Sequence, residues 1–374
     1  MFVKLVIYEM KYQIKSITFI IFCTFVLLFY VTQFIGDMDR IDTPSHPIDH
    51  MQTGDMDMVY KDSDSESHVT LEEQKNTLTS LLGRDLENHN TPLFDDMGRI
   101  ELIPLTDGQL TLLEQLNITL QDTTFTEALY GDMLEQLQQS FGEHTIYTQG
   151  MVKRYGAKVK NYLFNKQEAD AIKKYEKVTG AYARLFADYI GIAVGFFSIF
   201  IAGFALVKDK RYKAAEMIYT KPVSSIKYVL SKYVGNVVLM LAVVLIIAAY
   251  TTYTFHIEYD QINVFAFFRY TLTWILPTIM MVTSIGYLIQ IIAGNGIVPI
   301  IAIFAYWFYS MPFTRQQYHI TRYIIRYNKV TTLAKYQEVA SAITTNRLFI
   351  TGASLIILII ALWLFEKKRG HICG

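Results

Sequence analysis

Six long stretches of apolar residues run through the chain, separated by segments in which polar residues dominate. They cover residues 16–35, 185–207, 234–254, about 267–292, about 296–311 and 348–365. A helix that crosses about 30 Å of hydrocarbon needs roughly 17–25 residues, and most of these stretches have that length. The pattern therefore predicts an all-α integral membrane protein with six transmembrane helices. Five is the alternative number, because the short segment 293–296 is the sole break between the fourth and fifth stretches.

Residues 1–15, ahead of the first span, have the periodicity of an amphipathic helix. Val3, Ile7 and Met10 recur at helical spacing, while Lys4 and Lys11 lie off that stripe. Such a helix can lie in the membrane interface with its apolar face toward the acyl chains. We therefore expect an interfacial helix over residues 1–15, with an ordinary basic flank as the alternative.

The polar segment 36–184, between the first two spans, is long enough to form a domain of its own. Its first part, residues 36–67, is rich in Asp, Ser, Pro and Met and is predicted to be a flexible linker. Beyond it, apolar residues at helical spacing mark residues 69–86, 110–120, 125–141 and 159–182. We expect a mostly helical domain whose last helix runs directly into the second span.

Charge is distributed unevenly, although 34 basic residues balance 34 acidic ones. Residues 36–150 hold 23 acidic residues and five basic ones. Lys and Arg concentrate instead before the first span, in 208–232 and in 366–369, which the positive-inside rule assigns to the cytoplasm. Both termini, including the tail 366–374, are therefore expected inside the cell and the acidic domain outside. Arg322 and Arg326, between the fifth and sixth spans, disagree with this assignment.

Composition and motifs exclude several classes of function. Charged residues make up 18% of the chain, whereas soluble domains carry about 25%. Basic residues are spread around the apolar stretches, so a nucleic-acid partner is not expected. The sequence contains no GxxxxGK[ST], HExxH, GxSxG or CxxC motif, so no enzymatic activity is predicted for this chain. The charged residues inside the spans are Asp188 and Arg269, which are too few for a proton relay.

No metal or cofactor is expected either. Potential ligands gather between His46 and Met58, but their spacing matches no defined metal site and they lie in the predicted linker. The two cysteines, Cys23 and Cys373, cannot form a thiolate cluster.

Residues 208–232, between the second and third spans, combine a basic start, a short amphipathic piece and a proline. Proline stops the piece because it lacks the amide proton that a helix interior needs. The segment is expected to lie along the inner membrane face, where a partner could push on it; the alternative is an interfacial turn without a partner. The residues expected to take part are Lys210, Arg211, Glu216, Met217, Ile218, Lys221 and Pro222.

The run from Glu216 through residues 221–224 to Lys232 resembles the first cytoplasmic loop of ABC-transporter permeases of the type-2 exporter class. Two departures are that Ala214-Ala215 replace Gly-Thr and that Ser231 stands where Gly often precedes the lysine. In that family the loop is a coupling helix that docks on a separate ATPase subunit. The resemblance implies such a partner, which would bind ATP and Mg, and a second permease subunit, either the same chain or a sister chain.

The resemblance extends to the N-terminal helix, the six spans and the large insert after the first span. Family members carry short helices or a re-entrant segment outside, between the last two spans. Residues Tyr318–Tyr327 are accordingly expected on the outer leaflet, with their arginines facing the acidic insert. Within the second span, Gly191 and Gly195 form a GxxxG pair that predicts close helix packing.

Together these features predict the membrane-spanning permease subunit of an ATP-driven exporter. Residues 185–365 would hold spans two to six, and the chain would form the translocation path for a peptide or lipid-like compound in the lipid bilayer of the cell membrane. The alternative is a membrane-anchored sensor or binding protein whose extracellular domain recognises a ligand.

Overall fold

The computed structural model describes residues 2–38, 69–94, 100–121, 125–207, 224–311, 318–327 and 333–373. The chain divides into two compact units. The first, here called the membrane unit, comprises Met1–Ile41 and Ala171–Gly374. The second, called the insert unit, comprises Asp42–Asp170. The predicted linker lies almost wholly outside the described residues, since these stop at residue 38 and resume at residue 69.

The membrane unit consists of helices with long apolar runs. Among the described residues, five are long and apolar enough to cross a membrane: Ile17–Ile35, Thr179–Ala202, Ser225–Glu258, Ala266–Ala293 and Leu333–Lys368. In chain order the elements are α1 (Phe2–Ile14), α2 (Ile17–Phe29), η1 (Tyr30–Ile35), η4 (Ile172–Glu176), α7 (Thr179–Ala202), α10 (Ser225–Glu258), α11 (Ala266–Tyr270), η5 (Thr271–Ile275), α12 (Leu276–Ala293), α13 (Ile297–Ser310) and α14 (Leu333–Cys373).

The fifth expected span differs from the prediction in length. The helix there, α13, has 14 residues, so it rises about 21 Å and falls short of the hydrocarbon thickness of about 30 Å. It is nevertheless a separate helix. Gly294 ends α12 in the left-handed conformation at φ 73°, and Asn295 Oδ1 accepts hydrogen bonds from the amides of Ile297 and Val298, each at 3.1 Å. Five of the six expected spans therefore have spanning length, and the remaining one is this shorter helix.

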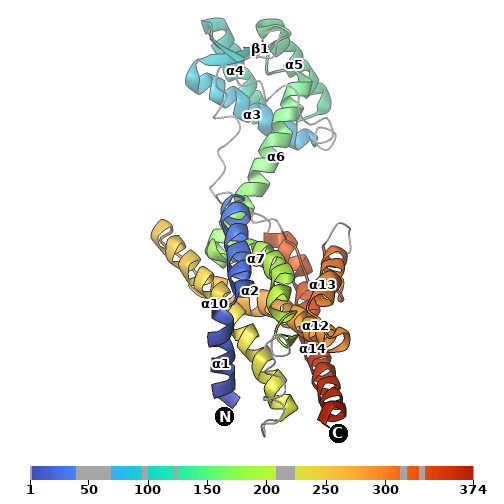
Figure 1. The fold of residues 1–374 in the computed structure, drawn as a ribbon. Coiled ribbons are helices and arrows are strands. Elements are labelled where there is room, and N and C mark those ends of the chain that lie inside the picture. Colours follow the sequence, from blue (N-terminus) through green and yellow to red (C-terminus); the bar gives the residue numbers. More distant parts are fainter. Residues whose placement is uncertain are drawn as a thin grey trace. The chain divides into compact units, whose positions relative to one another are not determined.

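Helix α7 is the centre of the membrane unit. Nearly all of its residues are buried, because α2, α11, α12 and α13 pack around it. Helix α1 packs along α10 and α14 packs along α12. Figure 1 shows the first of these pairs, with α1 in blue and α10 in yellow. Each helix pairing brings together segments that are distant in the sequence.

The expected continuous helix over residues 159–182 is interrupted. Residues Ile172–Glu176 form a π-helical turn, and Lys177 and Val178 then adopt positive φ angles of 51° and 62°. Left-handed backbone is unfavourable for a β-branched residue such as valine. The helix therefore ends here, and α7 begins anew at Thr179.

The insert unit is mostly helical, as expected, and also contains a small sheet. Its elements are α3 (Leu71–Asn88), β1 (Asn90–Phe94), β2 (Ile100–Pro104), α4 (Asp107–Leu120), α5 (Glu127–Phe141) and α6 (Gln149–Ala171). The two strands pair antiparallel, with Asn90 opposite Pro104. Capping residues set the helix starts: Thr70 with Glu73 and Thr106 with Gln109 form capping boxes, each of which satisfies free amides of the first turn.

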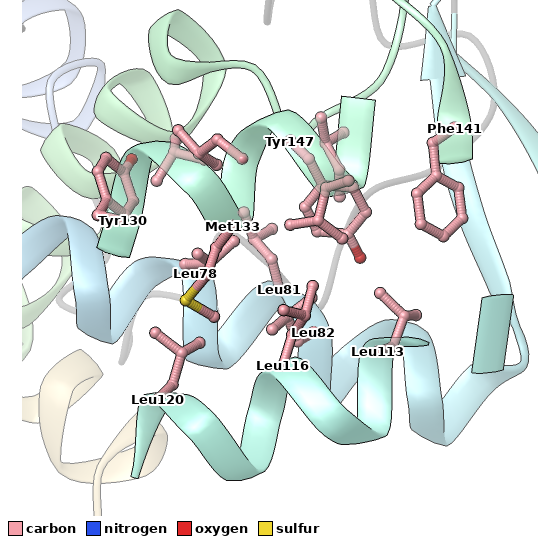
Figure 2. Close-up of a cluster of buried hydrophobic side chains, with 14 of the residues drawn as sticks. Leu78, Leu81, Leu82, Leu113, Leu116, Leu120, Tyr130, Met133, Phe141 and Tyr147 are labelled. Atoms are coloured by element: carbon pink, nitrogen blue, oxygen red, sulfur yellow. The ribbon is translucent and has the colours of Figure 1, made fainter. Parts of the chain in front are cut away.

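A compact hydrophobic core joins α3, α4, α5 and α6 (Figure 2). It includes Leu81 of α3, Leu113 of α4 and Leu137 of α5, none of which is exposed to solvent. These residues lie on the apolar stripes that the sequence periodicity indicated. One polar pair is buried beside them: the Tyr147 hydroxyl donates to Asp85 Oδ2 at 2.6 Å.

Candidate functional site

The residues predicted to contact an ATPase lie in a segment that the structure does not describe. Lys210, Arg211, Glu216, Met217, Ile218, Lys221 and Pro222 all fall between the described residues 207 and 224. Their role stays a prediction. The structure does describe what holds the two ends of this segment, and those contacts form the candidate site.

The end of α7 is held by a glutamine from another helix. The Gln290 side chain of α12 donates through Nε2 to the carbonyl of Gly203. Its Oε1 accepts from the amide of Leu206 at 3.1 Å. A helix end leaves backbone groups without intrahelical partners, and here one buried amide side chain satisfies a donor and an acceptor together. The exit from α7 is therefore fixed to α12 just before the predicted coupling segment.

The other end of the segment is tied to the same place by a lysine. Lys232 of α10 donates through Nζ to the carbonyl of Ala205 at 3.3 Å. The same atom lies 3.0 Å from Glu9 Oε2 of α1, and the two side chains are 7% and 9% exposed. A buried ion pair has little competition from water, so losing either partner is costly. We call Glu9, Ala205, Lys232 and Gln290 the anchor cluster.

Close backbone approach supports the anchor cluster. At Gly235, one turn after Lys232, an added Cβ atom would lie 3.3 Å from both Glu9 Cβ and the Val6 carbonyl oxygen. At Gly286 of α12 it would lie 2.8 Å from Ile199 Cδ1. These distances show tightly packed contacts of α1 with α10 and of α7 with α12. The two ends of segment 208–223 are therefore in close contact with two further helices, α1 and α12.

A second polar cluster surrounds the non-helical segment 318–327. Its expected position on the outer leaflet stays a prediction. The structure shows that the segment packs inside the membrane unit, since Tyr323, Ile324 and Ile325 are at most 1% exposed. Backbone without regular structure tolerates an apolar environment only where protein groups satisfy it. Arg347 of α14 provides this by donating to the carbonyls of Tyr323 at 3.0 Å and Arg322 at 3.4 Å.

Further side chains complete this support. Asn346 donates to the carbonyls of His319 and Arg322 at 2.7 and 2.8 Å. Asp188 of α7 accepts from the amide of Tyr327, with both carboxylate oxygens at 2.6 Å. The segment is thus buried because α7 and α14 both satisfy its backbone. Arg322 accordingly donates to the Met311 carbonyl within the membrane unit at 3.1 Å.

The glycines predicted to mediate helix packing lie on α7 facing different neighbours. A Cβ atom at Gly195 would be 3.1 Å from Ile324 Cδ1 and 3.3 Å from Thr278 Cγ2. At Gly191 the nearest atoms would belong to Trp274, at 4.0 Å. The tighter position is therefore Gly195, which faces segment 318–327 as well as α12.

A family model described as ABC-2 family transporter protein matches residues 3–369 of this chain. The chain belongs to the ABC-2 transporter family. No curated protein and no solved structure matches it significantly. Family membership makes the chain a membrane-embedded permease subunit of an ABC transporter and implies association with an ATPase subunit. The permease is the membrane component of such a transporter, not its catalytic one.

The described part of the permease contains no group of three or more His, Cys, Asp or Glu side chains that could hold a metal ion. The potential ligands between residues 46 and 58 lie outside that part.

Sequence reasoning missed most residues of both clusters, although each left a signal. Glu9 is the single acidic residue in the predicted interfacial helix. Gln290 is a polar residue inside the fourth apolar stretch, and Arg347 directly precedes the last one. A polar residue within or beside a spanning helix is a reason to look for a buried partner.

Proposed function

We propose that this permease is the translocation subunit of an ATP-driven exporter and that residues 208–232 are its coupling element. Two permease subunits, identical or paired with a sister chain, enclose the path. Two copies of the ATPase subunit bind ATP and Mg and drive the cycle from the cytoplasm. Both termini and the coupling element are cytoplasmic, and the domain within residues 36–184 is extracellular. The cargo is a peptide or lipid-like compound.

The observation that carries this proposal is the anchor cluster. A coupling element transmits force only if its ends are fixed to the helices that must move. Here the preceding end is bonded to Gln290 of α12 and to Lys232 of α10, and Lys232 is paired with Glu9 of α1. A push on segment 208–223 would therefore tilt α7 and α10 together with α1 and α12.

The test is affinity purification of the tagged permease in mild detergent, followed by mass spectrometry and an ATPase assay. The wild-type chain is expected to bring down an ABC ATPase in stoichiometric amount. Glu216→Arg is expected to lose it, because the reversed charge lies in the predicted contact. Glu366→Arg is the matched control, an exposed glutamate near the C-terminal end of α14, and should retain the ATPase.

Direction is tested separately with inside-out vesicles. ATP-dependent accumulation of cargo inside such vesicles would support export. A stable permease that purifies without any ATPase would refute the proposal and favour the alternative of a membrane-anchored sensor or binding protein.

A further inference from the structure

The guanidinium of Arg184, near the start of α7, is completely buried in the membrane unit. Two aromatic rings cover it: its Cζ lies 4.4 Å from the ring centre of Tyr336 and 5.9 Å from that of Tyr327. Such a contact with aromatic rings does not consume the N–H groups of a guanidinium, which stay available for hydrogen bonds. What those groups bind therefore decides what the residue does.

Not all N–H donors on the edge of the Arg184 guanidinium have a hydrogen-bond partner among the described residues. Nη1 donates to Glu176 Oε1. Nε and Nη2 have no hydrogen-bond partner among the described residues, and neither has Glu176 Oε2. Nε and Nη2 form the side-on edge of the guanidinium, which matches the two oxygens of a carboxylate or phosphate. A fully buried arginine with this edge open indicates that an anion belongs there, since unpaired buried donors are unfavourable.

Each neighbouring carboxylate that the structure describes already has a partner. Arg184 and Glu176 form one ion pair, and farther along α7 the buried Asp188 is close to Arg326 of segment 318–327. Asp188 already accepts a hydrogen bond from the Tyr327 amide and interacts electrostatically with Arg326. A further carboxylate nearby, Asp37, is exposed and accepts from the Tyr189 hydroxyl.

Arg347 is a further buried arginine of the membrane unit, and it contacts segment 318–327. Its partners are neutral oxygens, such as the Trp274 carbonyl and Thr278 Oγ1, each at 3.0 Å. In the described part of the chain no carboxylate lies within ion-pair distance of its guanidinium. Buried charge is strongly unfavourable in an apolar environment unless polar groups compensate it, and at Arg347 these oxygens provide that compensation.

We propose that Arg184 binds the anionic headgroup of an amphiphilic cargo through its Nε–Nη2 edge, and that Glu176, which is paired with Nη1, weakens this binding because it already neutralises the guanidinium. This inference rests on the proposed transport function and specifies its substrate class. The shared chemistry is a carboxylate or phosphate headgroup on an apolar chain. The amphiphile follows from the surroundings, because the site is walled by Tyr327 and Tyr336 and lies among helices of spanning length.

The contact of Glu176 with Arg184 is one that another anion could weaken. Its side chain is 15% exposed, whereas that of Arg184 is fully buried, and it contacts Arg184 through one oxygen. It folds back over Gly180, where an added Cβ would come within 2.8 Å of Glu176 Cβ. The left-handed residues Lys177 and Val178 follow directly, so the carboxylate sits at a chain bend and not inside a regular helix. A bidentate anion on the open Nε–Nη2 edge would therefore compete with Glu176 for the charge of Arg184 and not for the same N–H groups.

The experiment measures binding to the purified full-length permease in detergent by native mass spectrometry. Three ligands with an eighteen-carbon chain are used: oleate for the carboxylate, oleoyl lysophosphatidate for the phosphate, and oleyl alcohol as the neutral analogue. At least one acid is expected to bind more tightly than the alcohol, and the preferred acid identifies the headgroup. Arg184→Gln is expected to weaken acid binding about tenfold or more, the scale of hydrogen bonds to charged groups.

Glu176→Gln provides the decisive variant because it should act in the opposite direction. Removing the competing carboxylate is expected to tighten acid binding several-fold, a result that a purely structural ion pair would not produce. Lys335→Gln, an exposed charge beside Tyr336, should leave binding unchanged. The proposal is overturned if the alcohol binds as well as the acids, if no acid binds, or if Glu176→Gln weakens binding or leaves it unchanged.

The assay requires neither ATP nor an ATPase, so its outcome is separable from that of the proposed function. Loss of ATPase capture with intact acid binding would refute coupling and leave the anion site. If the permease still brings down the ATPase but binds no acid, the anion site is refuted and the proposed coupling stands.

Discussion

Neutralising Glu9 tests whether the anchor cluster is an energetic unit. Glu9→Gln keeps the size of the side chain and removes its charge, so the ammonium of Lys232 stays buried with the Ala205 carbonyl and without its carboxylate partner. Lys232→Met makes the converse change and leaves the carboxylate buried. The double variant removes both charges.

The burial of the pair sets the expected magnitude. At 7% and 9% exposure, neither side chain has the solvent access that reduces surface pairs to about 0–1 kcal/mol. Breaking a buried pair from one side destabilises by about 3–5 kcal/mol, whereas replacing both charges is often close to neutral. At about 2–4 °C per kcal/mol, each single variant should lower the unfolding temperature by about 6 °C or more, and the double variant should recover most of that loss.

The assay is thermal unfolding of the purified permease in detergent, followed by size-exclusion chromatography, at low salt and at high salt. Salt screens exposed charges far more than buried ones, so the effect should persist at high salt. Lys227→Met is the control, because Lys227 is an exposed lysine on the same helix. It should change the unfolding temperature by less than about 2 °C.

Additive losses of stability in the Glu9 and Lys232 variants would refute the interaction between these two residues. If the double variant lost as much stability as the two single variants together, Glu9 and Lys232 would not interact in the folded protein. The contact between α1 and α10 would then rest on the close packing at Gly235 alone.

Two further predictions follow from other parts of the chain. Gly195→Val should destabilise the permease by about 1–3 kcal/mol through overpacking, because even the first carbon would press on Ile324 at 3.1 Å; Gly352→Ala, where an added Cβ meets nothing within 4 Å, is the neutral control in the same thermal assay. In the insert unit, burial raises the pKa of Asp85 against the opposing hydrogen bonds from Thr91 and Tyr147. The folded state therefore holds the Asp85 proton more tightly than the unfolded state, and stability should fall as pH rises from about 4, the usual aspartate pKa, through the raised folded value. Hydrogen exchange of α3 peptides, corrected for intrinsic rates, should show this loss of stability with rising pH in the full chain. The pH dependence should disappear in Asp85→Asn and persist in the control Glu72→Gln. If it is unchanged in Asp85→Asn, another group causes it.

Much of the helical architecture was predictable because local periodicity and length determine it. Long apolar runs predicted the spanning helices, and the stripes at 69–86, 110–120 and 125–141 predicted α3, α4 and α5. The hairpin of β1 and β2 was not predicted, since each strand has only five residues and two short strands carry little periodic signal. The bend at Lys177 and Val178 was also missed, because neither residue favours a positive φ by its own chemistry.

For the candidate sites, too, residues that are neighbours in the chain could be predicted to act together, whereas residues from separate helices could not. Residues 208–232 could be predicted as a coupling segment because their basic start, amphipathic piece and proline are neighbours in the chain, and that role stays a prediction. The anchor cluster was not, because Glu9, Lys232 and Gln290 come from three helices and meet only when those helices pack. The burial of segment 318–327 within the protein was not predicted, for a related reason. Its tyrosines and arginines have the composition of an interfacial segment, and composition does not reveal that Arg347 and Asp188 would satisfy a buried backbone.

The sequence by itself determined that this protein spans a membrane, that its polar domain follows the first span, and which family its cytoplasmic loop resembles. These properties depend on residues that are adjacent or regularly spaced, whose transfer from water and helix formation are local. The tertiary structure alone decided which charged and polar groups are buried, and with which partners. That depends on distant segments meeting, because a buried charge is tolerated only where the fold brings a partner to it.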